Sequence, residues 1–181
     1  MRRMAMVLAG TVLMILTLPT PASAATATTA RPRDTSFAFV LLTPNTAVAQ
    51  GGGMMAQPGD WIQVTGGGAF NPDTGSVQAG GGFVHHNADG TVHCAGTWKA
   101  TALTGWTDFG ASRRGLHGGT VSLLVTHYCA TMGEIHTGIP MTVTSTRNAP
   151  TGSGLLDGVT VGEFARPTGG AVAIHAFGGH D

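Results

Sequence analysis

From Asp60 onward, turn-forming sequences rich in Asn, Asp, Gly and Pro divide the chain into short segments, with "NPDTG" at 71–75 and "NADG" at 87–90 as examples. Several segments alternate apolar and polar residues, which is the period of a half-buried β-strand. No long segment has the 3.6-residue period and capping residues of a helix. The pattern predicts strands at 37–42, 61–65, 76–79, 83–86, 91–99, 106–109, 119–129, 140–145, 158–164 and 171–177.

These strands predict an all-β fold with antiparallel pairing. Glycine runs at 66–68 and 80–82 are each followed by an aromatic residue, an Asp/Gly turn and a valine, so two hairpins form a weak internal repeat. Glycine inside a strand marks a bulge, a bend or a close backbone approach, and the corners of a small closed barrel need such bends. We therefore expect a small antiparallel β-barrel, with a β-sandwich as the alternative.

The first 24 residues have the layout of a secretory signal peptide. Arg2 and Arg3 precede an apolar stretch at 4–18, and Ala22, Ser23 and Ala24 form a small-x-small cleavage site. The apolar stretch of about 15 residues is shorter than the roughly 20 that a spanning helix needs, so we expect no transmembrane segment after cleavage. A disordered lead-in at 25–36 and one β-domain at 37–181 follow, in a protein that is secreted or held in the cell envelope.

Charge is scarce in this chain. Only 10% of residues are charged, and signal cleavage leaves seven basic residues against nine acidic ones, with Lys99 as the single lysine. Nucleic-acid binding needs a basic surface, so we expect no nucleic-acid partner. Arg113 and Arg114, near Asp108 and His117, could hold an anion, but an ordinary exposed loop is the explanation we favour. The sequence does not indicate an oligomeric state.

Strand alternation sends both cysteines to the same side as two histidines. A hairpin around 87–90 places His85 and Cys94 on its apolar face, and the apolar stretch 121–129 does the same for His127 and Cys129. Two cysteines on strands of an exported chain most often pair. We therefore predict a Cys94–Cys129 disulfide as the one covalent link of the domain.

We expect no cofactor, but three alternative hypotheses would give the chain a bound zinc or copper ion. A closed Cys₂His₂ zinc site would use His85, Cys94, His127 and Cys129. A blue-copper site needs two His, one Cys and an axial Met. The residues His127, Cys129, Met132 and His136 supply these types, but Met132 comes before His136, which is the wrong order. The looser alternative is surface zinc or copper binding by four histidines: His86, His93, His136 and His175.

The sequence contains neither H-E-x-x-H nor G-x-S-x-G, so no catalytic motif is present. We predict an exported, non-enzymatic β-barrel protein whose interior could hold a small apolar ligand. A histidine-rich metal-binding protein is one alternative. A barrel enzyme of the cyclase or isomerase type, with His85 or His127 as its ionisable group, is another. The aromatic side chains that would line a cavity or fill the core are Trp61, Phe70, Phe83, Trp98, Trp106 and Phe109.

Three segments carry a resemblance: "GDWIQVTGGGAF", "GGGFVHHNADGTVHCAGTWKAT" and "GGTVSLLVT". They resemble small exported β-proteins of actinobacteria that have no assigned role. The glycine-rich hairpins, the long apolar strand and the size are also similar to the allene oxide cyclase and dirigent barrel type over about 37–177. The resemblance implies a barrel. It implies no activity, because the catalytic residues of those families have no counterparts that can be matched here.

Overall fold

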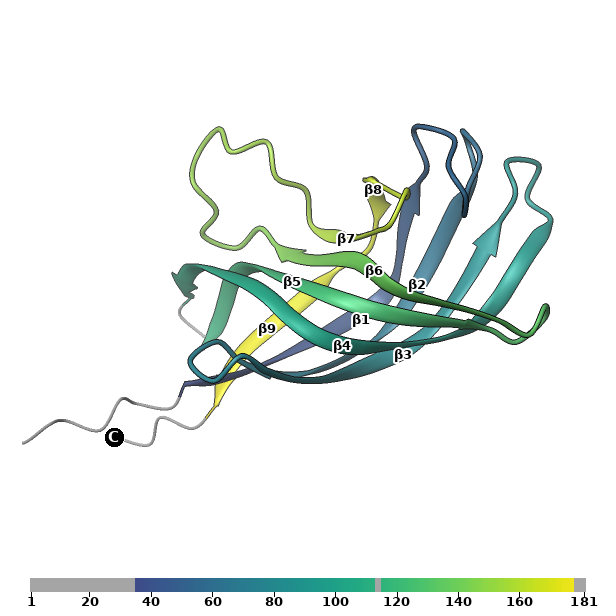
Figure 1. The fold of residues 1–181 in the computed structure, drawn as a ribbon. Helices are drawn as coiled ribbons and strands as arrows, with labels where there is room; N and C mark the ends of the chain where they lie inside the picture. Colours follow the sequence, from purple (N-terminus) through teal and green to yellow (C-terminus); the bar gives the residue numbers. More distant parts are fainter. Residues whose placement is uncertain (1–34, 113–114, 178–181) are drawn as a thin grey trace, which may run out of the picture. The chain divides into compact units, whose positions relative to one another are not determined.

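The computed structural model describes residues 35–112 and 115–177, and in them it contains nine β-strands and no helix (Figure 1). The predicted signal peptide, Arg113 and Arg114 lie outside the described residues, as does the predicted lead-in up to residue 34. The strands are β1 (Ser36–Val48), β2 (Trp61–Asn71), β3 (Ser76–His86), β4 (Val92–Ala111), β5 (Leu116–Cys129), β6 (Glu134–Ser145), β7 (Gly158–Val161), β8 (Arg166–Gly169) and β9 (Val172–Phe177).

Six of the strands close a hydrogen-bonded ring. Their order is β4-β3-β2-β1-β9-β5, and β5 pairs back onto β4. All pairings are antiparallel. The edge of β5 that faces away from β4 pairs with β9 at Leu116 and His117 and then with β6. Outside the ring, β7 pairs with β6, and β8 pairs with β1. The predicted all-β antiparallel fold with one disulfide is confirmed, and the ring of six strands is its central feature.

The glycine runs of the sequence repeat pair with each other. In the register of β2 and β3, Gly66 lies opposite Gly81 and Gly67 lies opposite Gly80. A Cβ atom on Gly81 would overlap the carbonyl oxygen of Thr65. Gly66 has a φ of 127°, a backbone conformation that side-chain-bearing residues rarely adopt. The glycines are therefore required where the two strands approach each other most closely.

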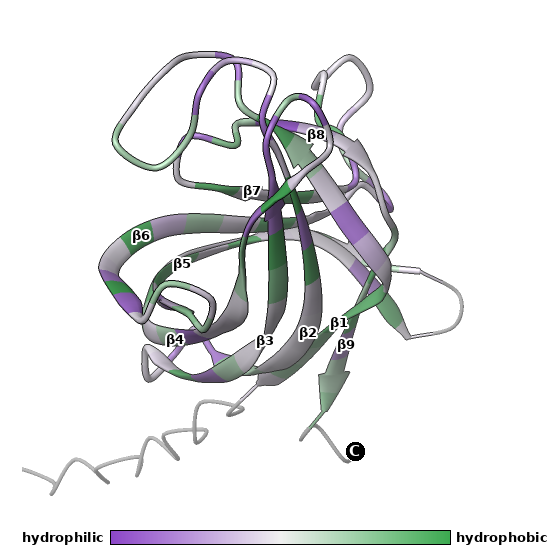
Figure 2. Cartoon of the chain, turned by 90° about the vertical axis from the view of Figure 1, so that its right-hand side faces the viewer, coloured by the Kyte–Doolittle hydropathy of each residue, from purple (hydrophilic) through white to green (hydrophobic). Residues whose placement is uncertain are grey.

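The inside of the ring is filled by apolar side chains. Figure 2 shows hydrophobic and hydrophilic bands alternating along the strands, as expected for a sheet with one buried face. Phe70, Phe83 and Trp98 belong to the buried core, and Trp106 packs partly buried against Phe70 with ring centroids 5.1 Å apart. Three of the predicted aromatic residues therefore fill the core. Trp61 does not join them, because its ring stacks on a histidine at 3.8 Å.

Several strands are longer than the sequence pattern predicts. β2 and β6 extend beyond the predicted 61–65 and 140–145, and β1 and β4 show the physical reasons for such differences. β1 continues past the predicted 37–42 and through Pro44, because a register shift between Leu41 and Asn45 lets the strand pass the proline without needing its missing N–H. The predicted segments at 91–99 and 106–109 form the single strand β4, which has three register shifts against β5. Such bulges break the two-residue alternation, and this hides the continuity of the strand in the sequence. The short strand β8 carries no alternation and was not predicted.

The described residues contain no helix of the length and apolar character that crossing a membrane requires.

Candidate functional site

The predicted disulfide between Cys94 on β4 and Cys129 on β5 is present. The two Cα atoms are 5.8 Å apart, and both residues are buried. The disulfide contradicts the alternative of a closed Cys₂His₂ zinc site made of His85, Cys94, His127 and Cys129. Two sulfurs bonded to each other supply no thiolate to a zinc ion. The bond also removes Cys129 as the thiolate of a blue-copper site.

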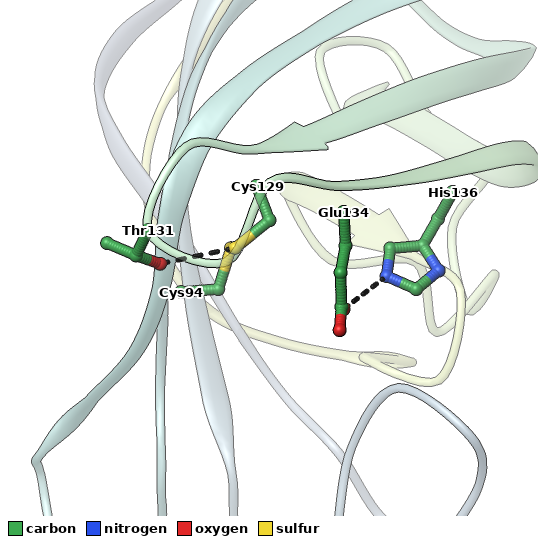
Figure 3. The surroundings of a disulfide bond; sticks show 5 residues. All are labelled: Cys94, Cys129, Thr131, Glu134 and His136. Atoms are coloured by element: carbon green, nitrogen blue, oxygen red, sulfur yellow. Dashed lines mark hydrogen bonds and ion pairs between the residues drawn. A yellow bond between two sulfur atoms is a disulfide. The ribbon is translucent and has the colours of Figure 1, made fainter.

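The strand register brings four functional side chains into the neighbourhood of this disulfide. His85 is the cross-strand partner of Cys94, and Glu134 is the partner of Cys129. Next to these pairs, His127 on β5 lies opposite His136 on β6. Figure 3 shows the side chains of Cys129, Glu134 and His136 on the same side of the β5–β6 hairpin. Directly opposite residues of an antiparallel pair point to one face, so the register places His85, Glu134 and the His127–His136 pair around the disulfide.

A β-bulge adds His93 to this group. Alternation predicts that His93 lies on the outer face with His86, and that His85 faces Val92. In the structure His85 faces Cys94 and His86 faces Val92, so His93 is the extra residue of the bulge. The rings of His85 and His93 are 4.7 Å apart, centroid to centroid. A bulge redirects a side chain in this way, and it also leaves Val92, which was expected inside, 54% exposed.

These residues line a cavity of about 60 Å³, which we call the histidine–methionine pocket. Seven of its eleven lining residues are histidine or methionine. The volume is enough for an ion with its ligands or for a few water molecules. The lining residues are Met54, Met55, Phe83, His85, His93, Cys94, His127, Cys129, Met132, Glu134 and His136.

His127 is the most buried histidine of the pocket. It is 3% exposed, and its ring stacks on Phe83 with centroids 4.5 Å apart. Burial, together with the nearby His136, lowers its pKa to about 4. Its ring nitrogens make no hydrogen bond to any described residue. At neutral pH His127 therefore presents an uncharged imidazole, the form that binds metal ions, to the pocket.

His85 is held by a buried carboxylate. Its Nε2 atom lies 3.3 Å from Oδ2 of Asp60, and burial lowers the pKa of His85 despite this partner. Burial alone would raise the pKa of Asp60, but hydrogen bonds from the backbone N–H groups of Gln57 and Ala88 and from His85 outweigh it and lower that pKa. A carboxylate on one ring nitrogen orients an imidazole and leaves Nδ1 free to bind a metal.

His136 has the same arrangement in a more open position. Its Nε2 atom lies 3.3 Å from Oε2 of Glu134, and the side chains are 41% and 52% exposed. Two of the four pocket histidines therefore have a carboxylate partner on Nε2. Histidines bound to metals in proteins commonly have this kind of partner.

The methionines come from two turns. Met54 and Met55 lie in the loop between β1 and β2, and the N–H of Met55 donates to Oε2 of Glu163 at 2.9 Å. Met132 lies in the β5–β6 turn, which is closed by a bond from the N–H of Gly133 to the carbonyl of Cys129. The histidine and cysteine positions follow a strand pattern in the sequence, whereas Met54, Met55 and Met132 lie outside every predicted strand and no sequence signal marks them.

Within residues 35–112 and 115–177, no group of three or more His, Cys, Asp or Glu side chains is arranged as a metal site. The imidazoles instead occur as two pairs, His85 with His93 and His127 with His136. A third ligand for an ion held by either pair would have to be another kind of donor, and the thioether sulfurs of the lining methionines are such donors.

The other predicted site residues lie outside the pocket. His86 stacks on Trp61, and His175 is exposed on β9. His117 lies 3.1 Å from Asp108 in an exposed pair, and the two arginines of that proposed anion site lie outside the described residues. Of the four histidines predicted as surface ligands, only His93 and His136 reach the pocket.

Comparison of the chain with protein-family models, with curated proteins and with solved structures finds no match in any of the three. The resemblance to exported actinobacterial proteins and to the allene oxide cyclase and dirigent type therefore stays a prediction.

Proposed function

We propose that this protein binds a transition-metal ion in the histidine–methionine pocket and acts as a non-enzymatic metal-binding protein outside the cytoplasm. The observation that carries the proposal is the composition of the pocket, in which seven of eleven lining residues are His or Met. Imidazole nitrogen and thioether sulfur are the donors that zinc and copper ions accept. The apolar N-terminal stretch and the disulfide support export, because disulfides persist in oxidising compartments.

The carboxylate partners of His85 and His136 give further support. Each holds one ring nitrogen at 3.3 Å and leaves the other for an ion. A metal-binding imidazole gains orientation and basicity from a carboxylate on its other ring nitrogen.

A small apolar ligand, the function first expected from the sequence, has less support. Sites for small organic molecules usually have about 300–1,000 Å³, far more than the 60 Å³ of this pocket. Larger hollows do exist, but they are shallow and lie over Gly82 and Gly96 or beside Asn71. Of the aromatic side chains that would line an internal cavity, Phe70 and Trp98 are buried in the core, and Phe83 is the one that lines the pocket.

The test is metal loading of the exported protein. Metal-free protein is incubated with zinc(II), copper(II) or copper(I), one ion per chain, and bound metal is measured by native mass spectrometry and elemental analysis. We expect one tightly bound ion. His93→Ala and His136→Ala change exposed or half-exposed pocket residues and should weaken binding while the protein still folds.

His175→Ala is the matched control, since His175 is an exposed strand histidine outside the pocket. It should bind metal as the wild type does. The proposal is overturned if no ion binds at stoichiometric concentration, or if the control loses as much binding as the pocket variants.

A further inference from the structure

We infer that the pocket takes copper in the +1 state, with the thioethers of Met54, Met55 and Met132 as ligands beside the histidines. The inference rests on the proposed function and names its ion. It starts from where the methionines lie. The described residues contain four methionines; Met141 is buried in the core, and the other three all line the pocket.

Core filling does not explain the pocket methionines. Met54 is fully exposed, Met132 is 44% exposed, and only Met55 packs partly against the core. A methionine stabilises a fold by burying its apolar side chain, so an exposed one contributes little to folding. Three methionines that line one small cavity together with four histidines therefore point to a use for sulfur.

The donor chemistry selects the ion. Thioether sulfur is a soft ligand that favours copper(I), whereas zinc and copper(II) are satisfied by imidazole and carboxylate. The cysteine sulfurs are bonded to each other, so methionine supplies the sulfur that remains available. The one carboxylate in the lining is Glu134, which is already engaged by His136. A ligand set that is mostly neutral suits an ion of single charge, because the cost of burying charge rises steeply with its magnitude.

The loop carrying Met54 and Met55 is held in place before any ion arrives. The N–H of Gly53 donates to the carbonyl of Ala56 at 2.9 Å, and the N–H of Met55 donates to Glu163 at 2.9 Å. A Cβ on residue 53 would overlap the Glu163 carboxylate, so glycine at this position permits the contact. Met54 and Met55 therefore already line the pocket together with the histidines, and binding does not have to order a free segment.

The same loop is tied to the histidine side of the pocket. The N–H of Gln57 donates to Asp60 at 2.8 Å, and that carboxylate oxygen also holds His85. One carboxylate thus joins the methionine loop to a histidine. A second cavity, of about 120 Å³, lies along this connection and is lined by both methionines and by His85 and His93.

The test compares copper(I) affinity in methionine and histidine variants. Under anaerobic conditions with ascorbate, metal-free protein competes with a colorimetric copper(I) chelator, and zinc(II) affinity is measured in parallel. The triple variant Met54→Leu, Met55→Leu, Met132→Leu conserves volume and should fold. We expect its copper(I) affinity to fall at least about 10-fold and its zinc(II) affinity to stay unchanged. A loss of about 10-fold is the lower end of the effect on metal affinity when a residue that only supports a metal ligand is replaced. Met141→Leu, in the core, is the matched control and should not change either affinity.

X-ray absorption of the copper(I)-loaded protein gives a second readout. The wild type should show sulfur neighbours of copper, and the triple variant should lose them. If His93→Ala and His136→Ala weaken metal binding but the triple methionine variant keeps full copper(I) affinity and the spectrum shows only nitrogen or oxygen, this inference fails and the proposed function stands. If neither histidine nor methionine variants change binding of any ion, both fail.

Discussion

His127 on β5 and His136 on β6 are direct cross-strand partners that line the same pocket, yet one is buried and the other is half-exposed. The pair thus joins the core of the domain to its surface. Burial of the imidazole, together with the nearby His136, lowers the pKa of His127 to about 4. The pocket therefore contains a neutral imidazole over most of the physiological pH range.

The stability of the metal-free protein should fall as the pH drops from about 6.5 to 4. His127 has a pKa near 6.5 when unfolded and about 4 when folded, so in this window the unfolded chain binds more protons. Protonation therefore favours unfolding, by up to about 3 kcal/mol at the acid end. Urea unfolding followed by tryptophan fluorescence at pH 7 and pH 4.5 measures the difference.

His127→Phe should keep the stacking on Phe83 and flatten this pH dependence. His85, whose pKa is lowered in the same direction, should leave a smaller residual slope. His175→Gln should behave as the wild type. An unchanged slope in His127→Phe would show that another group causes the acid sensitivity.

Asp60→Asn should destabilise the protein by about 1–3 kcal/mol. The Asp60 side chain accepts two backbone N–H groups and contacts His85, and an amide nitrogen in place of one oxygen leaves a buried donor without an acceptor. Asp108→Asn removes a carboxylate from an exposed histidine pair and should cost less than about 1 kcal/mol. Equal losses in the two variants, measured by urea unfolding at pH 7, would contradict this role of Asp60.

Replacing both disulfide cysteines with alanine should lower the free energy of unfolding by about 3–4 kcal/mol. The bond links residues 35 positions apart, and restricting a loop of that size in the unfolded chain gives this magnitude. Chemical denaturation of the double variant, beside wild type with and without reductant, measures the loss. Reduced wild type should match the double variant, and coinciding midpoints for reduced and oxidised wild type would refute the prediction.

Gly81→Ala should cost about 2 kcal/mol or more, because its new methyl group would overlap the backbone of Thr65 on the adjacent strand. Gly51→Ala is the matched control. Nothing lies within 4 Å of a Cβ at that position, so its thermal midpoint should stay close to that of the wild type. Similar midpoints for both variants would mean that the strands can separate at Gly81 without cost.

The sequence pattern was most successful where it depended on single strands. Alternation along 121–129 predicted that Val121, Leu123, Val125, His127 and Cys129 share the buried face, and all five are at most 3% exposed. The hairpin pattern likewise placed His85 and Cys94 inside, and both are buried. The same pattern predicted the wrong cross-strand partners for His85 and His86. A two-residue period fixes the face of a side chain but not the register, and the bulge at His93 shifts the register.

Local alternation, turn residues and cysteine chemistry are enough to predict the all-β class, the inward face of His85, Cys94, His127 and Cys129, and the pairing of the two cysteines. The folded chain is needed to show that β5 closes the ring onto β4 and β9, and that the Met54–Met55 loop, Met132 and four histidines meet at one cavity. Those contacts join segments tens of residues apart. Their geometry depends on bulges and on strand order, and a periodic pattern within one segment records neither.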